Sequence, residues 1–532
     1  MREYDPQDNF NRPNIQPIMD KNPNKQEFKL QKKQTMNQYI NITLDNMGFT
    51  RYHFLLFTTN AFILFCEGMQ EIIHIILLSM INEKHDLTNY HLAFMNSIEY
   101  LGYTVAALLL STITTYIKRK NAILICVILS LVCTGLSLTT FNFIFAAFNR
   151  FILGFCFGIL DLLIYLNLFE SLPTKIRGFV STMILLFFPL GEFTLSLFCF
   201  LKLKKGEVGT IEANYKYMLL APFICSCIIC LTAIFFQESP RELFFGKQEY
   251  LKGSESVKKI LQFNNDKNNQ NKFDFGNPEI AKATQNIQIE MGQIHQKEER
   301  NDDGLDLENN FKENIKEKGL LRDDVYTGKG SRLGKLFDSS YIKYTILFWI
   351  LGSCGGFVFN GIHFMLPATA PKINKKTFLD LVIFESMEIP PNFFAMLLIE
   401  NKEIGRKNTI RLGFFITFLI SLVNIYLGES ILLFDCLLKF SLTIPINVLI
   451  VYCSEIYSSD IRTLGLALVR CWRKFASLFS PFFMSYLMYK YGEFSTHLAY
   501  SPLLLIASIL SLFLTIETRG LALDEIIASD YK

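Results

Sequence analysis

The sequence predicts an all-α membrane protein with twelve transmembrane helices, built as two six-helix units that repeat in the same orientation. Its composition is one reason: half of the 532 residues are hydrophobic, 51 are Phe and only 19% are charged, as in membrane proteins. The second reason is that about twelve apolar runs have the roughly 20 residues that a spanning helix needs. The third is an internal repeat of charged motifs.

The apolar runs fall into two groups of six. The first group covers 53–80, 91–116, 121–141, 144–169, 178–201 and 216–236, and the second covers 341–366, 377–399, 409–428, 430–454, 464–488 and 496–516. Loops between neighbouring runs are short, so no room remains for a soluble catalytic domain. We therefore expect one six-helix bundle at 51–245 and another at 339–518.

Three polar segments flank and divide the bundles. Residues 1–50 are rich in Asn, Gln, Lys and Pro and lack the apolar core of a signal peptide, which predicts a disordered tail. Residues 246–338 form a polar central loop, a candidate site for a protein partner, and 519–532 form a short C-terminal tail. Lys and Arg counts in the short loops nearly tie, but the Lys-containing tail and central loop favour cytoplasmic termini.

Charge and cysteine usage exclude several functions. A formal net charge of +3 is too small to imply a nucleic-acid partner. The 12 Cys lie almost entirely inside apolar runs, without zinc spacing or a disulfide framework. No nucleophile, metal or nucleotide-binding pattern indicates an enzyme or a cofactor. The expected partners are a lipid bilayer and a small-molecule substrate, for a monomer in the plasma membrane or an intracellular vesicle membrane.

The internal repeat supports the two-unit arrangement. Glu170 lies seven residues before Arg177 in "ESLPTKIRG", and Glu455 lies seven before Arg462 in "EIYSSDIRTLG", an offset of 285. Two other motif pairs keep nearly this distance: "KRKN" at 118–121 with "GRKN" at 405–408, and "ESPR" at 238–241 with "ETRG" at 517–520. Each pair follows the second, fourth or sixth span of its unit. Such duplication is expected of a transporter whose halves rock about a site near the membrane centre.

At these motifs the chain resembles the major facilitator superfamily. The segments "QESPRELFFGK", "YCSEIYSSDIR" and "IETRGLALDE" look like signatures that follow helices six, ten and twelve in its sugar-porter-like branch. Within that branch, "MGFTRYHFLLFTTNAFILFCEGMQ", "SRLGKLF" and "ESMEIPPNFFAMLLIE" are most similar to organic-ion and synaptic-vesicle-protein-related transporters. The resemblance covers about residues 46–263 and 331–525. It implies the major facilitator fold and secondary transport by alternating access.

We interpret the repeated charges as gating latches. A carboxylate at a helix end and an arginine one loop away can pair when one side of a transporter is closed and separate when it opens. The alternative is ordinary surface salt bridges, worth under about 1 kcal/mol each. The candidate gating residues are Arg119, Lys120, Glu170, Arg177, Glu238, Arg241, Gly405, Arg406, Lys407, Glu455, Arg462 and Glu517.

The loop after the second span departs from the family pattern Gly-x-x-x-Asp-x-x-Gly-Arg-Lys. Thr115 stands where the aspartate is expected and Lys118 where the second glycine is expected. The second copy, "LIENKEIGRK", has extra residues, with Glu400 or Glu403 as its acid. We expect one weakened latch, which leaves open a slower transporter or one that no longer cycles.

Ionisable residues inside the spans are the candidates for substrate and coupling sites, because a charge at membrane depth costs at least about 2.5–3.5 kcal/mol. Glu67 and Glu71 share a face of the first span with His74, a set that can hold and pass a proton or form ion pairs. Glu385 and Glu388 lie in the eighth span, directly before two prolines that should kink it.

Other intramembrane acids have no evident partner in the sequence. For Glu99, Asp161 and Glu192, an interhelical partner and a ligand are equally consistent with the pattern. Asp435 and Lys439 are four residues apart in the tenth span, so they are expected to pair with each other.

The eleventh span carries three cations, Arg470, Arg473 and Lys474. Lys474 is twelve residues beyond Arg462, which places it about 18 Å along the helix and near the middle of the hydrocarbon layer. Arg470 is close enough to the surface to snorkel, and Arg473 is expected to turn toward another helix.

The expected substrate class is predicted from the position of Lys474. The segments "IRTLGLAL" and "SPFF" align this helix with the organic-ion transporters that the chain resembles. At the position of Lys474, those transporters tend to have an acidic residue when they carry cations and a basic residue when they carry anions. The resemblance thus implies a substrate carboxylate; the other interpretation is a structural cation neutralised by Glu67 or Glu385. A sugar is disfavoured, because Asn360 alone is a weak sugar donor. Phe359 and its aromatic neighbours would suit a flat substrate, although such residues more often serve packing and lipid contact.

The expected function is a secondary transporter for a small organic anion, such as an aromatic carboxylate, coupled to protons through Glu67, Glu71 and His74. The candidate substrate-binding residues are Lys474, Glu67, Glu71, Glu385, Glu388, Asn360 and Phe359. The alternatives are a sugar or organic-cation transporter of the same fold, and a non-transporting membrane interaction protein.

Overall fold

The computed structural model describes residues 48–85, 88–137, 142–202, 209–235, 332–369, 375–427, 432–492 and 494–520, with single positions between 239 and 260. This part of the chain is helical and contains no strand. Most of the predicted tail at 1–50 and central loop at 246–338, and nearly all of the C-terminal tail at 519–532, lie outside the described residues, as does Glu238.

Seven helices of the described residues form the first half of the bundle, here called the N-half. They are α2 (Arg51–His85), α3 (Asn89–Tyr116), α4 (Arg119–Leu136), α5 (Phe143–Ser171), α6 (Arg177–Leu185), α7 (Phe187–Lys202) and α8 (Gly209–Ala233). The helices α6 and α7 together make one span, Arg177–Leu201. The break between them follows from Pro189, which lacks an N–H and crowds the carbonyl of Leu185, the last residue of α6.

The second half, here called the C-half, begins with a short helix and continues with the remaining spans. Its helices are α14 (Arg332–Leu336), α15 (Ile342–Thr369), α16 (Lys375–Ser386), α17 (Ile389–Glu400), α18 (Gly405–Leu427), α19 (Leu432–Ile456), α20 (Arg462–Tyr491) and α21 (Phe494–Ser511). Pro390 and Pro391 occupy the first turn of α17, so the kink predicted for the eighth span is a complete break between α16 and α17.

The number of spans agrees with the sequence prediction. Nine spans in the described part of the chain are long and apolar enough to cross a membrane, and Met218–Ala233 and Ser495–Ser511 are shorter apolar helices. The twelfth is α20, which is long enough but carries Arg470, Arg473 and Lys474 within it. The described part of the chain therefore contains all twelve predicted spans.

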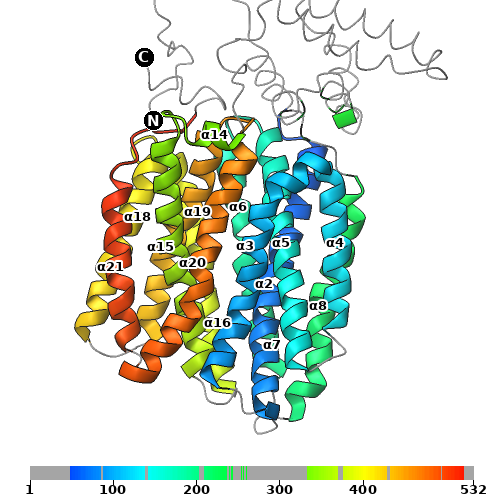
Figure 1. Cartoon of the computed structure of the whole chain (residues 1–532), viewed down its shortest axis with the longest axis vertical. Coiled ribbons are helices and arrows are strands. Elements are labelled where there is room, and N and C mark those ends of the chain that lie inside the picture. The colour runs from blue at the N-terminus through cyan, green and yellow to red at the C-terminus, as the bar shows by residue number, and fades with distance from the viewer. Residues whose placement is uncertain are drawn as a thin grey trace, which may run out of the picture.

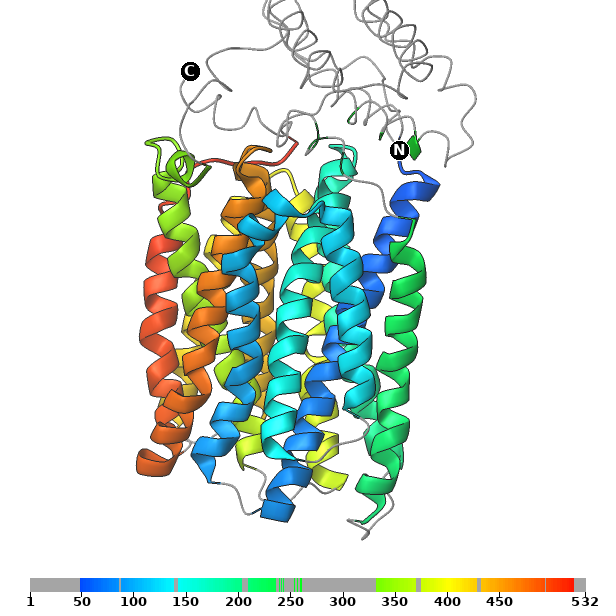
Figure 2. The ribbon, with the colours of Figure 1, turned by 45° about the vertical axis from the view of Figure 1, so that its right-hand side comes forward.

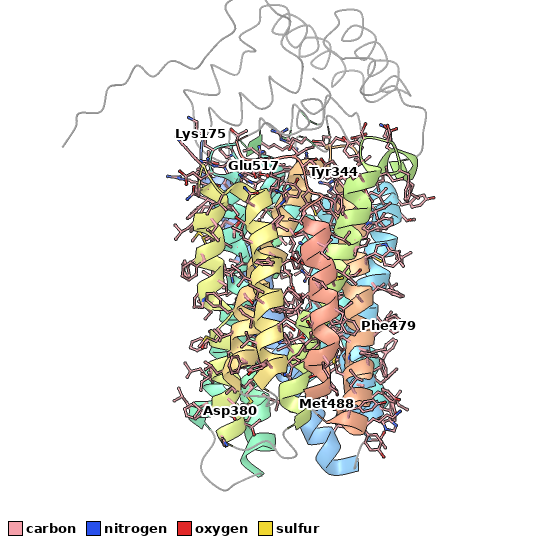
Figure 3. All side chains as sticks on the ribbon, turned by 90° about the vertical axis from the view of Figure 1, so that its left-hand side faces the viewer. Lys175, Tyr344, Asp380, Phe479, Met488 and Glu517 are labelled. Carbon is pink, nitrogen blue, oxygen red and sulfur yellow. The ribbon has the colours of Figure 1, made fainter. Side chains whose placement is uncertain are left out.

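The helices run nearly side by side along one direction (Figure 1). Lys175, Tyr344 and Glu517 lie at one end of the bundle, here called the terminal end, and Asp380 and Met488 lie at the opposite end (Figure 3). Side chains such as Phe479 point outward from the bundle, as expected for a surface that faces lipid.

The two halves meet along a few helix pairs. The helix α3 packs on α20, a contact that two views show (Figures 1 and 2), while α7 packs on α16 and α6 packs on α17. The contact surface therefore runs through the middle of the bundle, where α20 presents its three cations.

Candidate functional site

A small pocket lies between the two halves at the middle of α20. Its lining comes from α3 (Tyr103, Ala107), α5 (Gly158, Asp161, Leu162) and α20 (Arg470, Arg473, Lys474). The pocket therefore has one acidic and three basic side chains, contributed from both halves. None of the described lining residues is an amide.

Arg470 is paired across the halves. Its Nη1 bonds Asp161 Oδ2 of α5, and its guanidinium lies 5.7 Å from the ring centre of Tyr165. The expectation that Arg470 snorkels to the surface is therefore wrong, because a carboxylate of the neighbouring half neutralises it within the bundle. Asp161 correspondingly has an interhelical partner.

Arg473 and Lys474 have different surroundings. The Cβ and Cγ atoms of Arg473 lie against Gly352 and Gly356 of α15, and the residue also lines the pocket. The Nζ atom of Lys474 lies 4.0 Å from the ring centre of Tyr103 and 5.1 Å from that of Tyr100. No carboxylate oxygen of the described residues comes within 4.0 Å of either cation, so neither Glu67 nor Glu385 forms the direct ion pair with Lys474 that the alternative interpretation requires.

Two tyrosines join Lys474 to the acids of the first span. Tyr103 Oη donates a hydrogen bond to Glu67 Oε1, and Tyr100 Oη donates one to Glu71 Oε1 at 2.9 Å. Each ring thus presents its face to the ammonium group and its hydroxyl to a carboxylate. Sequence reasoning missed both tyrosines, although their three-residue spacing in "EYLGY" places them on one side of α3.

His74, the third member of this predicted group, is buried on α2, three residues beyond Glu71. The positive charge of Arg150 on α5 acts on it. Arg150 Nη1 pairs with Glu99 Oε2 at 3.2 Å, and its Nη2 donates to the carbonyl of Gln70 at 2.7 Å. Glu99 therefore has an interhelical partner as well.

A second charged group lies between the halves, around Lys439 of α19. Lys439 Nζ bonds Glu385 Oε2, and it lies 3.1 Å from Glu388 Oε2 and 4.0 Å from Glu192 Oε2. The predicted pair of Lys439 with Asp435 is wrong, because the side chain of Lys439 extends from α19 toward α16 and α7. Asp435 Oδ1 lies 3.6 Å from His497 Nε2 instead.

The residues expected to recognise a sugar or an aromatic substrate lie elsewhere. Asn360 Nδ2 donates to Gly356 O at 2.9 Å and to Ser477 Oγ at 2.6 Å, so its donors serve the packing of α15 on α20. Phe359 lies 4.6 Å from His363, measured between ring centres. Neither residue lines the pocket.

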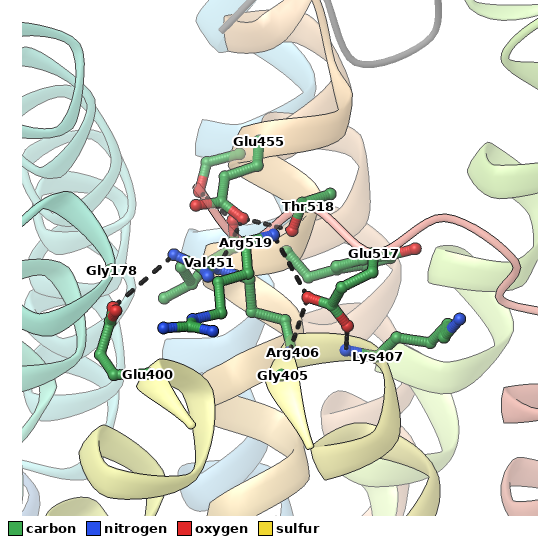
Figure 4. Close-up of polar contacts among 12 residues, drawn as sticks. Gly178, Glu400, Gly405, Arg406, Lys407, Val451, Glu455, Glu517, Thr518 and Arg519 are labelled. Carbon is green, nitrogen blue, oxygen red and sulfur yellow. Dashed lines mark hydrogen bonds and ion pairs between the residues drawn. The ribbon is translucent and has the colours of Figure 1, made fainter. Parts of the chain in front are cut away.

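The repeated charges at the terminal end form equivalent pairs in the two halves. Arg119 Nη1 lies 3.2 Å from Glu170 Oε2 in the N-half, and Arg406 Nε lies 2.8 Å from Glu455 Oε2 in the C-half. Glu400, one of the two acids considered for the second copy, lies 3.8 Å from Arg406 Nη2 (Figure 4). Despite Thr115 at the expected aspartate position, Arg119 keeps a carboxylate partner.

Other contacts at the terminal end join the two halves. Arg462 Nη1 of α20 lies 3.6 Å from Glu170 Oε1 of α5, and Arg119 Nη2 donates to Thr463 Oγ1. Arg241 Nε donates to the carbonyl of Glu170 at 2.9 Å. Glu170 is thus the centre of a network that holds both halves together at this end.

The remaining gating candidates occupy helix ends. Glu517 accepts hydrogen bonds from the backbone N–H groups of Arg406, at 2.9 Å, and Lys407, at 3.0 Å, at the start of α18 (Figure 4). Gly405 precedes them with a φ of 65°, a conformation that favours glycine. Lys120 is half-buried in the first turn of α4, and Arg177 lies over the ring of Phe169 at 5.5 Å from its centre.

Comparison with known sequences gives the family. The family model described as "Sugar (and other) transporter" matches residues 25–322 and 375–529. The chain is 23% identical to the synaptic vesicle 2-related protein of Rattus norvegicus over 515 residues, which cover 91% of this chain and 81% of that protein. It is 29% identical over 163 residues to the myo-inositol transporter FST1 of Gibberella moniliformis, a match that covers 30% of this chain and 27% of that protein.

Solved structures agree with the fold. The proton:xylose symporter XylE bound to 6-bromo-6-deoxy-D-glucose superposes with a TM-score of 0.66 at 16% identity, over 90% of this chain and 99% of that one. The transporter FucP in its outward conformation gives a TM-score of 0.57 at 12% identity, over 87% and 99% of the two chains. With a family model that matches well over half of its residues, the chain belongs to the sugar (and other) transporter family of the major facilitator superfamily and is a membrane transporter, not an enzyme.

Proposed function

We propose that this transporter moves a small organic anion, such as an aromatic carboxylate, across the membrane by alternating access, with its terminal end in the cytoplasm. The observation that carries the proposal is Lys474. Its ammonium group lies between the halves and beside a pocket, without a carboxylate in contact among the described residues.

The charges of the pocket favour an anionic ligand. The charge of Arg470 is offset by Asp161, whereas Arg473 and Lys474 lack such a partner in the part of the chain described. Burying an unpaired cation costs several kcal/mol, of which the tyrosine rings recover roughly 0.5–2 kcal/mol through cation–π contact. A substrate carboxylate would supply the missing charge, and the rings of Tyr100 and Tyr103 would pack against an aromatic body.

The terminal-end contacts fit a gate for the same cycle. A path from the pocket to this end requires that Glu170 separate from Arg462 and that Arg119 leave Thr463. The equivalent pairs inside each half, Arg119 with Glu170 and Arg406 with Glu455, would reform during each cycle. This assigns the repeated motifs to gating and leaves substrate recognition to the pocket.

Proton coupling has a physical basis in the tyrosine bridges. A substrate anion at Lys474 would repel an ionised Glu67, which lies on the other side of Tyr103. A proton on Glu67 removes this repulsion, so that anion and proton favour each other's binding. Glu71 is joined to Tyr100 in the same way, and His74 would exchange protons farther along α2.

Sugar transport is the competing function, because one relative is a myo-inositol transporter and the family includes sugar carriers. The described pocket lining favours the anion, since it holds cations but no Asn or Gln.

Uptake into liposomes containing the purified protein tests the proposal. Labelled aromatic carboxylates should accumulate faster when the outside is acidic, and Lys474→Ala should reduce uptake by at least tenfold, about 1.4 kcal/mol. Lys490→Ala is the matched control, because Lys490 lies exposed at the end of the same helix and should leave uptake unchanged. Undiminished carboxylate uptake by Lys474→Ala, or uptake of neutral sugars alone, would contradict the anion proposal.

A further inference from the structure

The charged group around Lys439 joins the halves near the opposite end of the bundle. Its members are Glu192 of α7, His363 of α15, Glu385 of α16, Glu388 at the start of α17 and Lys439 of α19. Asp380 marks the opposite end (Figure 3), and Glu385 is five residues farther along α16, about 7.5 Å deeper. The group therefore sits between the pocket and the opposite end.

The formal charges of this group do not balance. Three carboxylates face a single ammonium group, and the side chains of Glu192, Glu385 and Lys439 are all at most 1% exposed. With every acid ionised and His363 neutral, two negative charges would remain uncompensated inside the bundle. Such a charge excess is strongly unfavourable at membrane depth, so the group requires a bound positive charge.

Glu192 is the carboxylate with the least compensation. Lys439 bonds Glu385 and lies 3.1 Å from Glu388, but it is 4.0 Å from Glu192. Neither oxygen of Glu192 has a hydrogen-bond partner in the described part of the chain, although the side chain is fully buried. One of these oxygens comes within 4.8 Å of both a ring nitrogen of His363 and a carboxylate oxygen of Glu385.

A proton fits this place better than a metal ion does. A divalent cation held by Glu192, His363 and Glu385 would lie beside the ammonium group of Lys439 and be repelled by it. A proton needs no coordination shell and converts Glu192 into a hydrogen-bond donor toward the neighbouring carboxylates. Two charges act on the group from outside it: Glu71 of α2 adds to the negative potential at Glu192, and Arg473 of α20 offsets part of it at Glu388.

We propose that Glu192 is a proton-binding site that couples protonation to opening of the opposite end. In the arrangement described here, in which its side chain is fully buried, Glu192 is a carboxylic acid between α7 and α16. When the halves separate at this end, water reaches the side chain, its O–H bond breaks, the proton passes to water and a solvated carboxylate remains. Closing reverses the step. The inference rests on the alternating access of the proposed function but not on the chemistry of the substrate.

Hydrogen exchange measured by mass spectrometry on the full chain in lipid nanodiscs tests this inference without any substrate. After correction for the chemical exchange rate, wild-type peptides from α7 and α16 should exchange at least about fivefold faster in alkaline than in acidic buffer. In Glu192→Gln, which mimics the protonated acid, the two rates should agree within about twofold because the closed state no longer needs a proton.

Two further variants keep the test decisive. Asp380→Asn neutralises an acid at the same end of α16 but outside the charged group, so it should behave like the wild type. Should Glu192→Gln fail to fold, Glu192→Met removes the same acid with an apolar side chain of similar length and should also lose the pH dependence.

A pH-independent wild type, or a Glu192→Gln variant with the wild-type ratio, would overturn the inference. Loss of the effect in His363→Gln alone would overturn the assignment to Glu192. If carboxylate uptake fails but hydrogen exchange in α7 and α16 depends on pH as expected, the anion proposal is overturned and the proton-binding site at Glu192 is supported.

Discussion

At the scale of single residues, burial decides what each charge does. Arg470, Arg473 and Lys474 follow one another within five positions of α20, yet one has a carboxylate in the other half, one lies against glycines and one faces tyrosine rings. Helical phase distinguishes the three side chains, but only the neighbouring helices determine whether a counter-charge is present. Arg470 therefore has a structural ion-pair partner, whereas Lys474 lines a pocket in which a ligand could bind.

The pair of Arg470 with Asp161 should behave as a partly buried ion pair, because the two side chains are 13% and 18% exposed. Arg470→Met leaves Asp161 unpaired and should destabilise the protein by about 1–3 kcal/mol, whereas Arg470→Met combined with Asp161→Leu should recover most of that loss. Thermal unfolding of the purified variants measures both. An additive effect of the two substitutions would show that the side chains do not depend on each other.

At the scale of helices, local chemistry explains where the elements break and end. Pro189 ends α6, the two prolines at 390–391 separate α16 from α17, and α20 stops at Gly492, whose φ of 82° suits glycine. On the side of these breaks that faces the opposite end, α7 packs against α16, and Glu192 faces Glu385. The proline breaks are therefore part of the charged group's geometry.

The start of α18 provides a test at this scale. Glu517 occupies the unpaired N–H groups of Arg406 and Lys407, so Glu517→Ala should cost about 1 kcal/mol of stability through loss of a helix cap and of a favourable charge at the helix N-terminus. Glu403→Ala is the control, because Glu403 is an exposed acid two residues before Gly405. Equal melting temperatures for the two variants would show that the Glu517 cap contributes nothing.

The fold could be predicted from the sequence because each of its signals is local. The apolar runs predicted the spans, and the constant offset between the motifs indicated the repeat. Both signals can be recognised along the chain without knowing which helices are in contact. Partners across the bundle could not be predicted in the same way. Lys439 pairs with Glu385 rather than with Asp435, and Lys474 lies over Tyr103, because side-chain partners depend on which helices are neighbours.

At the scale of the whole molecule, the two halves are joined by charges at both ends of the contact surface. Glu170 joins Arg462 at the terminal end, and Glu192 approaches Lys439 nearer the opposite end. Between them lies the pocket with Lys474. An alternating-access cycle requires these two sets of contacts to break in turn, so weakening one should favour opening at that end and closure at the other.

Substitution of Arg462 tests this relation between the ends. Arg462→Gln removes the contact with Glu170 across the halves and should shift the equilibrium toward opening at the terminal end by about 1–3 kcal/mol, the usual size of such couplings. Hydrogen exchange should then increase in α6 and α17 and decrease in α7 and α16. Lys335→Gln is the control, because Lys335 pairs with Asp460 at 2.8 Å within the C-half. Loss of this ion pair leaves the contacts between the halves in place. Faster exchange at both ends would instead indicate general destabilisation, and the ends would then not be coupled.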